Sequence, residues 1–152
     1  KYLLVEEEVP YTAAERTREI ANVSVSYANM LTRTTDELAS SLSVRFTESP
    51  EIVQKNTNQA VMVSCVLQKA TDANKLATNL RDQGKVEEAK KVLVNNGRYL
   101  ESNAARWESK ALGDYAIEQR LDLENLDDDI KYNLRRKQMR ASQFKNEKQQ
   151  SY

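Results

Sequence analysis

The chain has 152 residues, enough for one ordinary domain or two small ones, and its 23 Lys and Arg balance its 23 Asp and Glu. It contains no His and one Cys, which excludes Ser-His-Asp and Cys-His catalytic sets, zinc sites built from His and Cys, and an internal disulfide. No glycine-rich phosphate-binding pattern occurs, and the acids lie in runs typical of solvated helix faces. The protein is therefore not expected to be an enzyme, although paired carboxylates alone could in principle carry out glycoside hydrolysis or proton transfer.

Three segments at the start of the chain alternate apolar and polar residues, as half-buried strands do. They are Lys1–Val9, the "ANVSVSYA" segment of residues 21–28, and residues 38–47. The short "LTRTTDE" link cannot make a parallel crossover, so the second and third strands are predicted to be antiparallel. The apolar residues expected to form one sheet core are Leu3, Val5, Val23, Val25, Tyr27, Leu42, Val44 and Phe46.

Three strands with one apolar face need a covering layer. The hydrophobic alternation is already under way at Lys1, so we expect the gene product to continue upstream. Residues 1–49 are accordingly interpreted as part of a β-sandwich that missing upstream strands complete.

Residues 50–152 are predicted to form a helical domain with a frayed basic C-terminal tail. Ser49 and Pro50 are a favourable N-cap and first helical residue. A long helix is predicted over residues 58–83, with Gly84 as its C-cap, followed at once by an antiparallel partner helix. A second break is predicted at "SKALGDY", with Gly113 as the cap and Asp114 as the next N-cap. The expected helical core is Met62, Val66, Leu80, Leu93, Leu100 and Trp107.

These elements predict the α+β class: three antiparallel strands followed by a helical hairpin or bundle of three to four helices. The small residues of the first long helix suit a close approach of its partner.

Charge is segregated near the C-terminus. Residues Asp114–Asp129 carry a net charge of −6, and Lys131–Tyr152 carry +6. The candidate partner-binding residues are Arg135, Arg136, Lys137 and Arg140. Because a neutral chain is not typical of a nucleic-acid binder, we expect contacts within the chain or with a protein. Replacing these four residues by Gln is expected to leave the fold largely intact.

The order of the elements resembles the C-terminal region of prokaryotic von Willebrand factor type A (VWA) proteins. The resemblance is carried by "EEEVP", "REIANVSVSYANMLT", "LSVRFTESPEIV" and "LQKATDANKLATNLRDQGKVEEAKKVL"; it covers about Lys1 to Trp107 and, more faintly, "RRKQMRASQ". The family's DxSxS metal motif is not in these residues. The resemblance implies a non-catalytic structural and protein–protein interaction module, and a divalent cation only in an absent VWA domain.

No catalytic, cofactor-binding or metal-binding residue is therefore predicted in this chain. The expected partner is a protein, including an upstream VWA domain of the same polypeptide, and a homo-oligomer is left open. No apolar run approaches the ~20 residues of a membrane helix, and no signal peptide is visible. The single Cys favours a reducing compartment, so a cytoplasmic location is expected.

Two alternatives to this interpretation stay open. The "LRDQGKVEEAKKVL" segment, Leu80–Leu93, has the spacing of a tetratricopeptide repeat hairpin, which favours an independent helical adaptor. However, the segment 34 residues later lacks the glycine and the alanine in register, whereas repeat arrays need about three units. The second alternative is nucleic-acid binding by the basic tail.

Overall fold

The computed structural model describes residues 2–10 and 12–149. The described chain is α+β: a two-stranded antiparallel hairpin is followed by five helices. It divides into two compact units, one formed by Val5–Thr57 and the other by the residues from Asn58 onward together with the first few residues of the chain.

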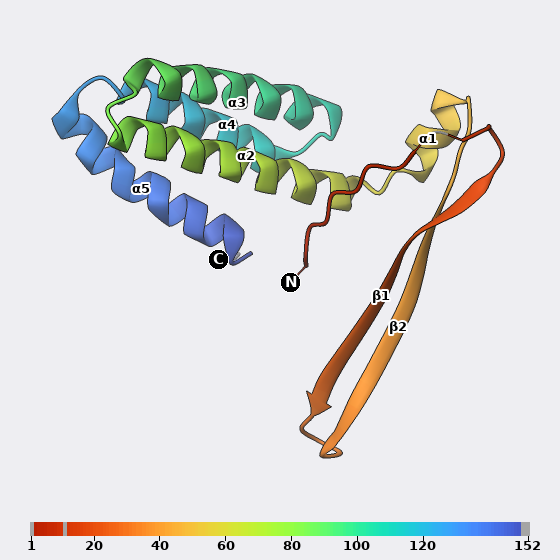
Figure 1. Ribbon diagram of the computed structural model, residues 1–152. Coiled ribbons are helices and arrows are strands. Elements are labelled where there is room, and N and C mark those ends of the chain that lie inside the picture. The colour runs from red at the N-terminus through yellow and green to blue at the C-terminus, as the bar shows by residue number, and fades with distance from the viewer. Residues whose placement is uncertain (1, 11, 150–152) are drawn as a thin grey trace. The chain divides into compact units, whose positions relative to one another are not determined.

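The first unit is built on a long hairpin (Figure 1), in which β1 spans Thr17–Asn29 and β2 spans Thr34–Arg45. The strands are antiparallel, with Val25 opposite Leu38, and one irregularity in the register lies between Glu19 and Ala21. Alternating Val, Ser and Tyr residues suit an extended, pleated backbone. The predicted antiparallel pairing of these two strands is confirmed.

The loop between the strands is held by the Asn29 side chain. Its Oδ1 accepts hydrogen bonds from the backbone N–H groups of Leu31 and Thr32, and its Nδ2 donates to Asp36 at 2.7 Å. Arg33 adopts a φ of 61° and donates its N–H to the Asn29 carbonyl at 2.8 Å. The tip of the hairpin is therefore ordered by polar contacts within the loop.

The strand predicted over Lys1–Val9 is wrong, because none of the described residues in that segment is extended in a sheet. Tyr2 instead donates its backbone N–H to Gln149 Oε1 at 2.7 Å and accepts from Gln149 Nε2 at 2.6 Å. Alternation alone does not make a strand, since the backbone groups of a strand need an adjacent edge to bond. The predicted three-stranded sheet is thus a two-stranded ribbon.

The predicted sheet core is also wrong. Leu3 and Val5 are 94% and 82% exposed, and the apolar side chains in the middle of the ribbon keep about half of their surface in solvent. Val44 and Phe46, near the base of the hairpin, are half-buried. The physical reason is that a two-stranded ribbon has no layer to cover its apolar face.

The helix starts predicted at Ser49–Pro50 and near residue 58, and the hairpin at Gly84, are confirmed. Helix α1 spans Pro50–Asn56, and the Ser49 side chain accepts a hydrogen bond from the Ile52 N–H at its start. Helix α2 spans Gln59–Asp82 and α3 spans Val86–Arg106. Gly84 has a φ of +78°, and the Lys85 N–H donates to the Leu80 carbonyl at 2.9 Å, which is a Schellman motif.

The second helix break lies earlier than predicted. Helix α4 spans Lys110–Glu124, and Ser109 is its N-cap, so Gly113 and Asp114 lie inside the helix and not at its boundary. The chain reverses where Glu108 adopts a φ of 47°. Helix α5 then spans Asp129–Glu147, so the acidic and basic segments lie mainly on separate helices. The tail expected to fray is helical as far as Glu147, and its residues 150–152 lie outside the described part of the chain.

The second unit is a bundle of α2, α3, α4 and α5 (Figure 1), in which α3 packs against both α2 and α4, and α5 packs mainly against α2. Its interior has two apolar clusters. One contains Val66, Ala70, Leu100, Leu112, Tyr115 and Ala116. The other contains Ala77, Ala89, Leu93, Leu126, Tyr132 and Met139. Most of the predicted helical core is confirmed: Val66, Leu93 and Leu100 are buried, and Leu80 and Trp107 pack against the clusters.

Candidate interaction surfaces

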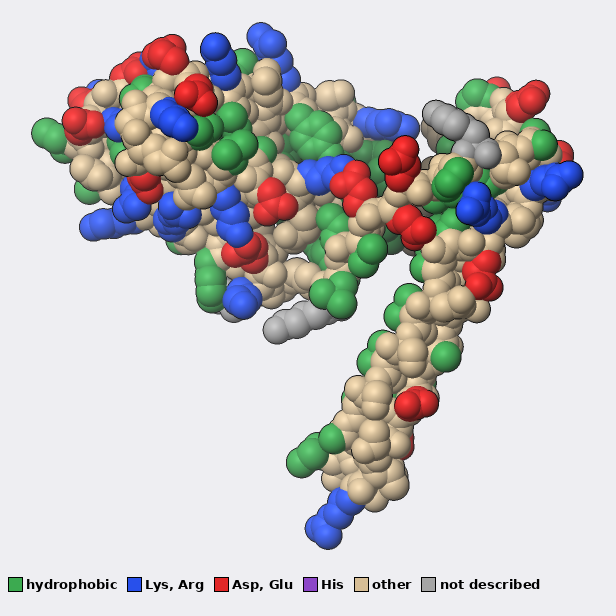
Figure 2. Space-filling view, viewed as in Figure 1, with side chains coloured by type: hydrophobic (Ala, Val, Ile, Leu, Met, Phe, Trp, Pro, Cys, Tyr) green, Lys and Arg blue, Asp and Glu red, His purple; other side chains and the backbone are tan. Residues whose placement is uncertain are grey.

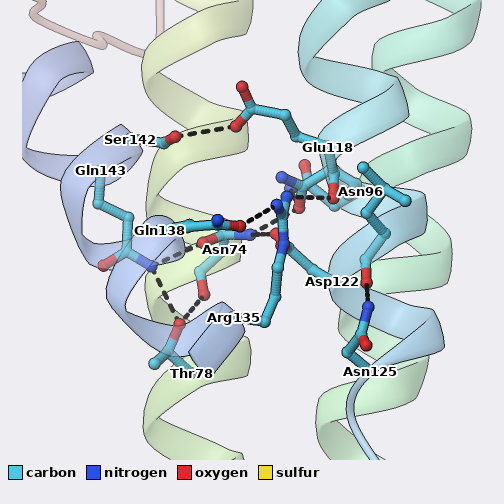
Figure 3. Close-up of polar contacts among 12 residues, drawn as sticks. Asn74, Thr78, Asn96, Glu118, Asp122, Asn125, Arg135, Gln138, Ser142 and Gln143 are labelled. Carbon is cyan, nitrogen blue, oxygen red and sulfur yellow. Dashed lines mark hydrogen bonds and ion pairs between the residues drawn. The ribbon is translucent and has the colours of Figure 1, made fainter. Parts of the chain in front are cut away.

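Polar side chains from the helices of the bundle form a layer of contacts (Figure 3). Along α2, α3 and α4 these side chains stand in sequence between residues of the two apolar clusters. Asn74 of α2 lies at the centre of the layer and donates to Gln119 Oε1 at 2.9 Å and to Asp122 Oδ2 at 2.8 Å. Asn96 donates to the same Gln119 oxygen at 2.8 Å, and Gln143 donates to Asn74 Oδ1 at 2.6 Å. All four helices thus contribute to one buried hydrogen-bonded layer.

Sequence reasoning missed this polar layer, although a signal was present. Asn74, Asn96, Gln119 and Gln143 each stand three or four residues from a buried apolar residue on the same helix, such as Asn96 between Leu93 and Leu100. An amide in an apolar stripe indicates a buried polar contact, because a buried amide without partners is costly. These hydrogen bonds fix which residues of the four helices face one another.

The candidate partner-binding residue Arg135 is part of this layer and is not free for a partner. Its Nε donates to Asp122 Oδ1 at 2.5 Å, and its Nη2 donates to the Glu118 carbonyl at 3.2 Å. The Asp122 side chain is 3% exposed and that of Arg135 is 16% exposed. Burial raises the pKa of Asp122, and the Arg135 guanidinium opposes that rise. The pair joins the acidic α4 to the basic α5.

Arg136 and Arg140 meet at a different carboxylate, Asp82, at the end of α2. Their Nη2 atoms lie 2.7 and 3.4 Å from Asp82 Oδ2, and the Tyr132 hydroxyl donates to Oδ1 at 2.7 Å. Partial burial acts to raise the pKa of Asp82, but the hydrogen bonds and charges of these neighbours outweigh it and hold the pKa below its ordinary value. Lys137 lies on the exposed side of α5.

The four predicted residues therefore do not form one joint basic surface. Arg135 binds Asp122 on one side of α5, whereas Arg136 and Arg140 bind Asp82 on α2. Sequence reasoning anticipated contacts between the acidic and basic segments, which the Arg135–Asp122 pair provides. It did not anticipate Asp82, which lies outside both segments.

The hairpin offers a different kind of surface. Figure 2 shows hydrophobic side chains in the open along its length, with few charged side chains between them. On one face of the ribbon, Val23 is 54% exposed, Val25 49%, Leu38 61% and Leu42 56%. The sheet contains two strands, so each strand also has an outer edge without a neighbouring strand among the described residues. Such a face and such edges are typical of a surface that another chain covers.

Two further features lie at the ends of the hairpin. At the tip, Met30 and Leu31 are 87% and 93% exposed. At the base, a pocket of about 570 Å³ opens between the end of β2 and α1, and its apolar lining includes Val44, Ile52 and Val53. The hairpin unit therefore carries two exposed apolar residues at its tip and, at its base, a pocket lined by three apolar and six polar residues.

Within residues 2–10 and 12–149, no group of three or more Cys, Asp and Glu side chains is arranged to hold a metal ion. Across the same part of the chain, no helix combines the length and the apolar character needed to cross a membrane. No family model matches the chain, and no curated protein and no solved structure matches it either.

Proposed function

We propose that this chain is a non-catalytic structural and protein–protein interaction module that accompanies a metal-binding VWA domain. The observation that carries the proposal is the uncovered apolar face of the β1–β2 hairpin. The resemblance of about Lys1 to Trp107 to the C-terminal region of VWA proteins supports the choice of partner.

The energetics of the hairpin support a role in binding. A two-stranded ribbon is marginally stable in water on its own. Val23, Val25, Leu38 and Leu42 each keep about half of their surface exposed. Burying the remainder under a partner would contribute roughly 1 kcal/mol for each side chain, since full burial of such a side chain contributes about 1.5–3 kcal/mol.

The helical unit supports a structural role. Its buried polar layer links amides from four helices by hydrogen bonds, although Asn96 Oδ1 and Gln119 Nε2 are buried without a partner. Such a layer favours one arrangement of the bundle. The three arginines of α5 form ion pairs with Asp122 and Asp82. These contacts within the bundle are the support for its structural role.

The coding sequence upstream of Lys1 supplies the partner for the test. If it encodes a strand followed by DxSxS, that domain is produced separately and titrated with the 152-residue chain by calorimetry in the presence of magnesium. The expected result is binding that Val25→Asp weakens at least about tenfold, because it puts a charge on the apolar face. Ser24→Asp, on the opposite face, is the matched control and should leave the affinity within about twofold.

Two outcomes would contradict the proposal. One is an upstream sequence without the DxSxS motif. The other is a VWA domain that does not bind the chain, or that binds the Val25→Asp and Ser24→Asp variants with equal affinity.

A further inference from the structure

We propose that two copies of this chain form a two-fold dimer by pairing the outer edges of their β2 strands in an antiparallel ladder centred on Ser41. The inference rests on the proposed function, in that it takes the hairpin as the interaction surface. It goes beyond that function by naming a second copy as an occupant of the β2 edge and by fixing the register.

The direction of the backbone groups of β2 defines which residues can pair. Phe46 directs both of its backbone groups toward the first strand: its N–H donates to the Arg16 carbonyl at 2.9 Å, and its carbonyl accepts from the Glu15 N–H at 2.8 Å. In an antiparallel ladder this direction alternates from residue to residue, and the one register shift lies on β1. The even-numbered residues of β2 therefore face β1. The odd-numbered residues, with Ser41 in the middle, direct their N–H and carbonyl groups to the outer edge.

The side chains select the register among those that this alternation allows. With Ser41 opposite Ser41 of the other copy, Glu37 lies opposite Arg45 twice across the two-fold axis, and Leu38 lies opposite Val44. Both Glu37 and Arg45 are exposed, and Arg45 also forms an ion pair with Glu15 of its own copy. Opposite charges directly across a ladder attract, and small side chains at the axis allow close approach.

The neighbouring registers that the alternation also allows are centred on Ser40 and on Leu42. The first places Arg45 opposite Thr35, and the second places it opposite Ala39. Neither register brings Arg45 opposite an acid. The charge pattern of β2 is thus self-complementary in one register.

The same register joins the apolar features of the two hairpins. Directly opposed residues share one face of a sheet, so the exposed faces that contain Leu38 in each copy become one face of a four-stranded sheet. Such a sheet exceeds the two strands that are marginal in water.

The first test is the mass of the 152-residue chain in solution, measured by sedimentation equilibrium over the micromolar range. The expected result is a dimer that Ser41→Pro weakens at least about tenfold, because proline removes the N–H groups at the centre of the ladder. Ser24→Pro is the matched control, since it removes an outward N–H from the edge of β1. Circular dichroism verifies that both variants keep the wild-type helical content.

Charge reversal gives a second test that does not depend on proline. In a Glu37→Arg dimer, position 37 of each copy carries an arginine opposite Arg45 of the other copy. In an Arg45→Glu dimer, Glu37 of each copy lies opposite an acid at position 45. Like charges then meet at both pairs, so each variant alone should be monomeric. An equimolar mixture of the two variants restores both attractive pairs. It should form a heterodimer at the concentrations at which the wild-type chain dimerises.

Three results would overturn the inference: a wild-type chain that stays monomeric, a dimer weakened equally by Ser41→Pro and Ser24→Pro, or a mixture of the two charge variants that fails to associate. Titration of the same chain with the VWA domain separates this inference from the proposed function. A monomer that binds that domain refutes the dimer alone, and a dimer that does not bind it refutes the proposed function alone.

Discussion

Replacing Arg135 by Gln is predicted to destabilise the helical bundle by about 3 kcal/mol at neutral pH. The substitution leaves the Asp122 carboxylate, whose side chain is 3% exposed, without the cation that it contacts at 2.5 Å. Removing one partner of a buried ion pair typically costs about 3–5 kcal/mol. We take the lower end because Asp122 keeps a hydrogen bond from Asn74 at 2.8 Å.

The cost should depend on pH, with a sign that follows from the Asp122 carboxyl group. Burial already raises its pKa, and loss of Arg135 removes the charge that opposes the rise. In the variant the folded state therefore binds a proton more readily than the unfolded state. The free energy of unfolding that the variant loses relative to the wild-type chain should be largest above the pKa of Asp122 in the folded state. The loss should become smaller as the pH falls through that pKa, because a protonated carboxyl group no longer needs a cation.

The assay is urea unfolding followed by circular dichroism at several pH values, with Arg136→Gln as the matched control. Arg136 is 43% exposed and shares the Asp82 carboxylate with Arg140, so its loss should cost at most about 1 kcal/mol. The double variant Arg135→Gln, Asp122→Asn should recover part of the loss, because no buried charge remains. Equal effects of the two arginine substitutions would refute the reasoning. The structure thus opposes the expectation that Arg135 could be replaced with little effect on the fold.

Two further predictions concern stability. Gly84→Ala should lower the free energy of unfolding in urea by about 1 kcal/mol, because the φ of this residue is +78°. Gly113→Ala should raise it by about 0.5–1 kcal/mol, because this residue lies inside α4 and nothing lies within 4 Å of the added methyl group. Changes of the same sign in both variants would contradict the capping argument. Burial raises the pKa of Tyr115 from 10.0 to about 12, so the folded state keeps a proton that the unfolded state loses. The free energy of unfolding should therefore fall between pH 10 and 12 by roughly 3 kcal/mol on account of this residue, and Tyr115→Phe should show a correspondingly smaller fall in alkaline urea titrations.

Local features of the fold could be predicted from the sequence because they depend on the backbone preferences of a few neighbouring residues. Ser49 and Pro50 begin α1 as expected, and Gly84 supplies the positive φ that closes the hairpin of α2 and α3. The alternation in "ANVSVSYA" and the short link after it similarly predict two antiparallel strands.

The local signals failed where a competing interaction was stronger. Gly113 was expected to end a helix, yet it lies within α4, because a glycine inside a helix costs only up to about 1 kcal/mol and the burial of Leu112 and Tyr115 beside it outweighs that cost. The alternation at Leu3 and Val5 suggested a strand, yet both side chains are exposed and the segment has no adjacent strand to bond.

The sequence by itself thus determined the α+β class, the hairpin, the helical pairing at Gly84 and the segregation of charge into an acidic and a basic helix. Only the tertiary structure decided which charges meet. Arg135 binds Asp122, 13 residues away, whereas Arg136 binds Asp82, 54 residues away. Periodicity assigns a residue to a face of its own helix, but the partner of a buried polar group depends on how four helices pack together, and that packing follows from the total burial of all of them.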